Sequence, residues 1–258
     1  MKLIKELWLY REMTKNLVKR DLKSRYKGSI LGFLWMLINP LFQLVIYTIV
    51  FGYILPSDID KFYMFLFVAL VPWIFFSECL NGGTTCVKSQ QDLVKKIHFP
   101  RQVLPISFVA SRFVNMLLSF VVIFIVIIFS GIGVNPLALL LLPVIMLLEF
   151  MMALGITFLA SALTVYFRDM EHIFSVLTLA WMYMTPVLYS PERIPEELQF
   201  ILYANPMSQI IIMYRDVLYY KKFPTGESML YATIFAVVLL LIGSIVFERL
   251  QRHFAEEL

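Results

Sequence analysis

Few side chains in this sequence have the types and spacing that catalysis requires. The three histidines, His98, His172 and His253, are far apart in the chain, and no HExxH or GxSxG motif occurs. A GxxxxGKS/T phosphate-binding motif is also missing, and Cys79 and Cys86 lack the spacing of a disulfide or metal site. The sequence therefore predicts neither an enzyme nor a cofactor or metal site. Any ATP that drives this protein must bind another chain.

Three ionisable residues, Glu78, Arg112 and Glu149, lie within or beside long apolar runs. Glu149 is near the middle of its run and would be costly if it faced lipid, so it should face a helix, a subunit interface or water. Arg112 could extend to the membrane interface. A single carboxylate without a neighbouring series favours structural pairing or polar gating over an ion relay. A proton-coupled secondary transporter using Glu149 remains an alternative.

Aromatic and amide side chains share two other apolar runs. Flat apolar faces with polar edges can stack on sugar rings and bind hydroxyl groups, which suits a conduit for a glycan. Aromatic belts and ordinary helix packing would also explain single members of the set. The candidates for lining a channel are Trp35, Asn39, Phe42, Gln43, Tyr47, Trp181, Tyr183 and Tyr189.

The composition indicates the environment of these residues. Hydrophobic residues make up 60% of the 258 residues, charged residues 16%, and the mean hydropathy is +0.79. A soluble domain of this size could not bury so many apolar side chains, whereas a bilayer accepts them as lipid-facing surface. The net charge of +4 is too small to indicate nucleic-acid binding. We expect an all-α polytopic membrane protein.

Six apolar stretches are long enough to approach the roughly 20 residues that a membrane-spanning helix needs. They are residues 30–55, 62–79, 106–129, 137–165, 173–189 and 229–247. With the N-terminus inside, sixteen Lys and Arg residues fall on the cytoplasmic side and five on the other. This asymmetry predicts that both termini are cytoplasmic.

The segment 1–29 before the first predicted span is rich in Lys and Arg and has no small-residue cleavage site. Its apolar residues approximate a helical stripe. We expect an amphipathic helix in the cytoplasmic interface, with Trp8 and Tyr26 at the depth of the headgroups. A solvated basic tail is the alternative. The transmembrane domain then comprises residues 30–258.

The segment 190–228 contains two apolar runs that are too short to span a membrane, residues 198–204 and 210–213. Pro195 precedes the first run, and Asn205 and Pro206 separate the two. We expect a re-entrant pair of helices that forms a gate on the extracytoplasmic side. An ordinary external loop with a surface helix is the alternative.

A basic stretch, VKSQQDLVKKIHFPR at residues 87–101, lies between the second and third predicted spans. This stretch and four others resemble the membrane subunit of type-two ABC exporters for polysaccharides, the Wzm-like family that exports O-antigen, capsule and teichoic acid. The resemblance is carried by RDLKSRYKGSILGFLWMLINP (20–40), VKKIHFPRQVLP (94–105), VYFRDMEHI (165–173), TPVLYSPERIP (185–195) and ANPMSQIIIMYRDVLY (204–219).

The resemblance implies a homodimer in the bacterial inner membrane, with a lipid-linked polysaccharide passing between the protomers. It also implies two copies of a separate ATPase subunit, which binds ATP and Mg. Residues 88–100 would be the coupling helix that docks on this ATPase, and a plain basic loop would not explain its interleaved apolar residues. The expected contacts are Asp92, Val94, Lys95, Lys96, Ile97, His98, Phe99 and Pro100. An ABC permease for a drug or small lipid is the nearest alternative.

Overall fold

The computed structural model describes residues 8–26, 28, 31–50 and 58–258, and this part of the chain is helical with turns and has no strand. The first helices are α2 (Arg11–Tyr26), α3 (Trp35–Ile49), α4 (Phe62–Thr85), α5 (Gln91–Lys96) and α6 (Val103–Ser130). They are followed by α7 (Pro136–Leu139), α8 (Leu142–Tyr166), α9 (Met170–Met184), α10 (Phe200–Ala204), α11 (Pro206–Leu218), α12 (Gly226–Leu250) and α13 (Phe254–Glu257). Short 3-10 turns include η1 (Gly32–Leu34), η3 (Lys88–Gln90), η4 (Pro191–Arg193), η5 (Glu196–Leu198) and η6 (Gln251–His253).

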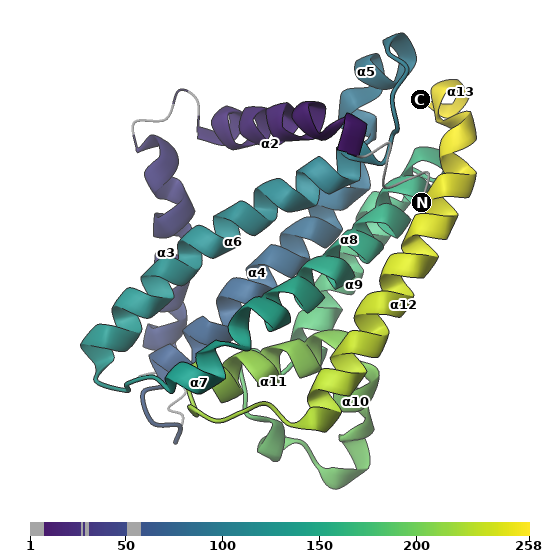
Figure 1. Ribbon diagram of the computed structural model, residues 1–258. Coiled ribbons are helices and arrows are strands. Elements are labelled where there is room, and N and C mark those ends of the chain that lie inside the picture. The colour runs from purple at the N-terminus through teal and green to yellow at the C-terminus, as the bar shows by residue number, and fades with distance from the viewer. Residues whose placement is uncertain (1–7, 27, 29–30, 51–57) are drawn as a thin grey trace.

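Helices α4, α6, α8 and α12 form a bundle of roughly aligned helices, with α3 standing along one side (Figure 1). Helix α2 lies across one end of the bundle, where α5 and α13 are also found. Helices α10 and α11 are at the opposite end. These two ends are called the α2 end and the α11 end below.

The predicted spans agree with the helices in part. Four helical stretches in the described part of the chain are long and apolar enough to cross a membrane: Phe62–Thr85, Val103–Ser130, Pro136–Tyr166 and Gly226–Glu257. They cover the second, third, fourth and sixth predicted spans. Helices α3 and α9, at the first and fifth positions, have 15 residues each. The first predicted span continues into residues 51–55, which lie outside the described residues. Six spans therefore remain a prediction.

Helix α9 ends earlier than the predicted fifth span because of a proline. Thr185 follows the helix with φ −99° and ψ 134°, which is extended backbone. Pro186 disfavours the α conformation in the residue that precedes it. In α4, by contrast, Pro72 lies inside a helix that continues to Thr85, six residues beyond the predicted end of the second span. Pro186 thus follows the end of a helix, whereas Pro72 is accommodated inside one.

The core of the bundle is centred on α4, which is buried along most of its length. A smaller apolar cluster at the α2 end combines residues from the ends of α4, α6, α8, α12 and α13 with the α5 segment. Helices α8 and α12 are closely packed at two glycines: a Cβ atom on Gly243 would clash with the carbonyl oxygen of Gly155. Small residues allow such close approach of transmembrane helices.

Candidate translocation and coupling site

The predicted coupling helix forms a shorter element at the α2 end. The 3-10 turn η3 leads into α5, which ends at Lys96, because Ile97 is extended with φ −126° and ψ 135°. The helix therefore ends four residues before Pro100, the predicted end of the coupling helix. Asp92 lies 3.9 Å from Lys96, and both side chains are mainly exposed. An exposed pair of this kind contributes little to stability.

The coupling segment exposes only part of the predicted contact set. Val94 and Phe99 are buried in the apolar cluster at the α2 end, so these two side chains anchor the segment to the protein itself. Pro100 is half-buried. Apolar burial of this kind fixes the orientation of a short helix that could not be stable alone. The exposed members of the set are Asp92, Lys95, Lys96, Ile97 and His98.

Two polar contacts join the start of this segment to other helices. The Arg20 guanidinium of α2 donates a hydrogen bond to the Gln90 side chain at 2.6 Å. The Lys88 ammonium lies 2.7 Å from the Glu171 carboxylate in the first turn of α9. The segment that precedes α5 is thus linked both to α2 and to the helix at the fifth span position.

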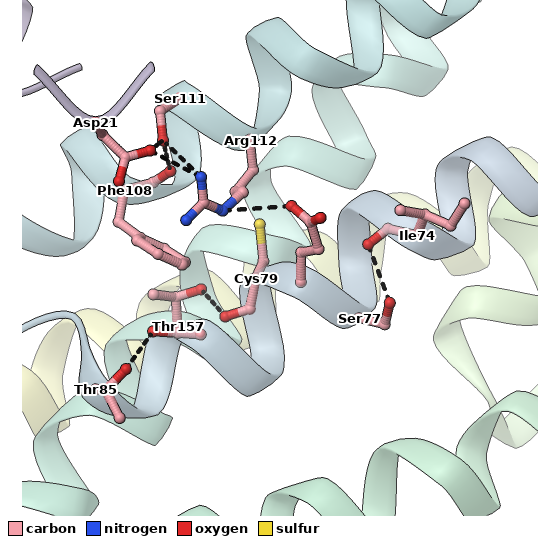
Figure 2. Close-up of polar contacts among 11 residues, drawn as sticks. Asp21, Ile74, Ser77, Cys79, Thr85, Phe108, Ser111, Arg112 and Thr157 are labelled. Atoms are coloured by element: carbon pink, nitrogen blue, oxygen red, sulfur yellow. Dashed lines mark hydrogen bonds and ion pairs between the residues drawn. The ribbon is translucent and has the colours of Figure 1, made fainter. Parts of the chain in front are cut away.

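Arg112 lies at the centre of a charged cluster shown in Figure 2. Its Nη1 atom is 2.8 Å from Oδ2 of Asp21, and Ser111 donates a hydrogen bond to the same oxygen at 2.7 Å. On its other side, Nε of Arg112 lies 3.4 Å from Oε2 of Glu78. The guanidinium is also 4.3 Å from the centre of the Phe108 ring. Three helices, α2, α4 and α6, therefore meet at one arginine.

The Arg112 side chain is only 7% exposed, so it is paired inside the protein rather than extended to the membrane interface. Removing a charge from water is costly unless oppositely charged groups and hydrogen bonds compensate for it. The two carboxylates supply this compensation. Arg112 is thus paired with two carboxylates, whereas the sequence had suggested extension to the membrane interface.

Three of the predicted channel-lining residues come together around a cavity of about 150 Å³ beside Arg112. Trp35, Asn39 and Gln43 line it from α3, and Glu78 and Arg112 line it from α4 and α6. The other two α3 candidates do not line this cavity. Phe42 is exposed, and Tyr47 packs against the core.

The candidates on and after α9 have structural contacts. Trp181 packs edge-on against Phe76, with ring centres 5.2 Å apart, and its Nε1 atom donates a hydrogen bond to Asn205 at 2.7 Å. Tyr183 is exposed. The Tyr189 hydroxyl donates a hydrogen bond to the Tyr183 carbonyl oxygen at 3.0 Å. Of these three, Tyr183 alone presents most of its ring at the surface of the protomer.

Asn205 joins the two short helices to the end of α9. Its side-chain oxygen accepts a hydrogen bond from the Met207 amide at 3.0 Å and so caps α11. Its Nδ2 atom donates hydrogen bonds to the Met184 carbonyl oxygen at 3.2 Å and to the Thr185 hydroxyl at 2.9 Å. Pro206 then occupies the first position of α11, where a missing amide hydrogen costs nothing.

The two predicted apolar runs lie in two helices, α10 and the longer α11. Pro195, the third predicted gate residue, is exposed and precedes η5. The break between the runs falls at Asn205, as the sequence predicted. Whether the pair enters a membrane remains a prediction.

Arg215 on α11 is a buried residue that sequence reasoning assigned to an external segment. Its side chain is almost fully buried, and its guanidinium carbon lies 3.5 Å from the centre of the Phe65 ring. It donates hydrogen bonds to the carbonyl oxygens of Val187 at 2.7 Å, Tyr189 at 3.2 Å, and Pro186. A signal was available in the sequence, because Arg215 follows the apolar run at residues 210–213 within one helical pattern.

Glu149 is completely buried in α8 and accepts a hydrogen bond from the Tyr214 hydroxyl at 2.6 Å. Its partner is thus a neutral phenol of α11. A proton relay needs a series of groups that exchange protons, and this pair links two helices instead. The contact supports a structural role for Glu149.

No group of three or more metal-binding side chains occurs among the described residues. Cys79 and Cys86 are both free and buried.

A helical membrane protein with an exposed basic segment at one end and paired charges between its helices has the features of a transporter permease. The chain belongs to the ABC-2 type transporter membrane family, whose model matches residues 12–219. It is 36% identical to the O-antigen export system permease protein RfbA of Myxococcus xanthus, over the full length of both chains. It is 30% identical to the protein of that name from Klebsiella pneumoniae, over 93% of this chain and 92% of the relative. The polysialic acid transport protein KpsM of Escherichia coli is 23% identical, over 87% of this chain and 88% of the relative.

Proposed function

We propose that this chain is the transmembrane subunit of an ATP-driven exporter that moves a lipid-linked polysaccharide across the bacterial inner membrane. Two copies form the channel between them, and two copies of a separate ATPase subunit bind at the α2 end. The α2 end faces the cytoplasm, and α10 and α11 form a re-entrant gate at the opposite membrane surface. Helices α3 and α9 complete the six spans.

The observation that carries the proposal is the full-length similarity to O-antigen export permeases together with the exposed coupling segment. Lys95, Lys96, Ile97 and His98 project at the α2 end, while Val94 and Phe99 hold them in place from below. An interface of charged and apolar side chains on a fixed helix suits a cleft in a partner subunit. The segment can therefore receive force without unfolding.

The contacts of the coupling segment suggest how its movement reaches the pathway. Closure of the ATPase subunits would displace α5 and η3. The Lys88–Glu171 pair would pass this displacement to α9, and the Arg20–Gln90 contact would pass it to α2. Helix α2 in turn is joined by Asp21 to Arg112 in the bundle. Rigid helices that move together in this way can open a gate at their interface.

Reversing the charge of two exposed coupling residues tests this proposal. In K95E/K96E, two negative charges replace the two exposed positive charges that would face the ATPase, which should disrupt the interface and lower export of the glycan by about tenfold or more. Export is measured as glycan at the cell surface, and ATPase binding as co-purification. Because Val94 is buried, a change there would disturb the fold and is a poorer test.

The matched control is E196K/E197K, which reverses two exposed charges at the α11 end. It should leave ATPase binding intact. Normal export and normal co-purification by the K95E/K96E variant at the wild-type membrane level would contradict the coupling assignment.

A further inference from the structure

The cavity beside Arg112 has the polar character of a ligand site. Asn115 lines it from α6, and the Asn115 side-chain oxygen is buried and has no hydrogen-bond partner among the described residues. A buried acceptor without a hydrogen-bond donor is costly. A ligand that donates a hydrogen bond to this oxygen would remove that cost.

The charges around the cavity select against anions. Arg112 is the one cation among the described residues that line the cavity, and it already lies against the carboxylates of Asp21 and Glu78. A phosphate or a carboxylate would have to compete with these two carboxylates for the guanidinium. A neutral ligand with several hydroxyl groups fits both the charge and the unsatisfied acceptor.

The remaining walls fit the two faces of a sugar ring. Trp35 offers a flat apolar surface, and Asn39 and Gln43 add amide groups that both donate and accept hydrogen bonds. The volume of about 150 Å³ equals that of about five water molecules at ~30 Å³ each. This is room for one sugar ring and not for an oligosaccharide.

A second, more open hollow is also lined by Glu78 and Arg112. It has a volume of about 250 Å³ and is bounded by Ser77 and Asn81 of α4. Asn81 also accepts a hydrogen bond from Thr178 of α9 at 3.1 Å. The charged pair therefore lines both hollows.

From these observations we infer that each protomer contains a binding subsite for one neutral sugar ring, in the cavity between α3, α4 and α6 at the α2 end. Asn115 accepts a hydroxyl hydrogen bond from the ring, and Trp35 contacts its apolar face. The inference rests on the proposed function, since the sugar is a unit of the exported glycan. It places that unit within a protomer, beside the shared channel.

Binding of free sugars to the purified exporter in lipid nanodiscs tests this subsite. The probes are glucose, galactose and N-acetylglucosamine, followed by saturation-transfer NMR, with glucose 6-phosphate as the anionic probe. At least one neutral sugar should bind, and glucose 6-phosphate should bind more weakly than glucose. In N115L, which keeps the side-chain volume but removes the acceptor, binding should weaken roughly two- to tenfold.

The matched control N16L makes the same replacement at an exposed position of α2 and should bind sugar normally. Three results would overturn the subsite: no response to any neutral sugar, equal binding by N115L and wild type, or equal binding of glucose and glucose 6-phosphate. The proposed function is tested separately by measuring glycan export of the wild type. Normal export without sugar binding refutes the subsite alone, whereas loss of the gene without any export defect refutes the function.

Discussion

Two buried arginines illustrate how single residues are stabilised in this protein. Arg112 is compensated by the carboxylates of Asp21 and Glu78, whereas Arg215 is compensated by backbone carbonyl oxygens and the Phe65 ring. The ion pairs of Arg112 join three helices, α2, α4 and α6. The hydrogen bonds of Arg215 tie α11 to the chain that leaves α9, because Pro186, Val187 and Tyr189 supply the carbonyl groups.

Replacing Arg215 with methionine should destabilise the protein strongly. The variant R215M keeps much of the side-chain volume but removes the donor to four carbonyl oxygens, those of Phe65, Pro186, Val187 and Tyr189, and each buried unsatisfied group costs about 1 to 3 kcal/mol. We expect a loss of roughly 3 to 5 kcal/mol, measured by denaturant unfolding in detergent. R193M removes an exposed arginine and should change stability by less than about 0.5 kcal/mol. Equal stability of both variants would show that the Arg215 contacts contribute nothing.

At the scale of elements, close packing of α8 against α12 depends on two glycines. The nearest atoms to a Cβ on Gly243 belong to the backbone of Gly155, and those to a Cβ on Gly155 belong to the backbone of Leu239 and Leu240. A backbone cannot rotate away as a flexible side chain does. An added methyl group must therefore push the two helices apart.

The variant G243A should lower stability by about 1 to 3 kcal/mol, the usual range for overpacking. Thermal unfolding in detergent measures the change. Gly226 is the control, because a Cβ there meets nothing within 4 Å; G226A should unfold close to the wild-type temperature. If G243A were as stable as G226A, the helices would have to be less tightly packed than the structure has them.

The whole molecule has two chemically different ends. At the α2 end, exposed Lys and Arg side chains accompany the coupling segment, while the α11 end carries α10, α11 and the acidic turn η5. The excess of basic residues at the α2 end favours the cytoplasm. The nineteen residues from Phe200 to Leu218 include both short helices and lie at the other end.

The predicted orientation can be tested by labelling single cysteines in intact spheroplasts with a membrane-impermeant maleimide. Glu196→Cys should label, whereas Lys95→Cys should label only after the membrane is permeabilised, since both positions are exposed but lie at opposite ends. The native Cys79 and Cys86 are buried and should give no background. The reverse labelling pattern would place the α2 end outside.

The sequence by itself determined the helical membrane class, the break at Asn205 and the basic stretch between the second and third predicted spans. These depend on local properties: long apolar runs, proline and asparagine preferences, and charge between spans. The extended backbone at Thr185 could also have been predicted from the sequence, because Pro186 follows it.

Only the tertiary structure decided which polar groups meet. The partners of Arg112 come from α2 and α4, and those of Arg215 come from the segment after α9. The tertiary structure also buries Val94 and Phe99 in the protein's own apolar cluster. It places Asn115, which the sequence analysis had not singled out, in the same cavity as Trp35, which it had. These pairings depend on helices that are distant in sequence and on their rotation about their axes, and neither is specified by local propensity.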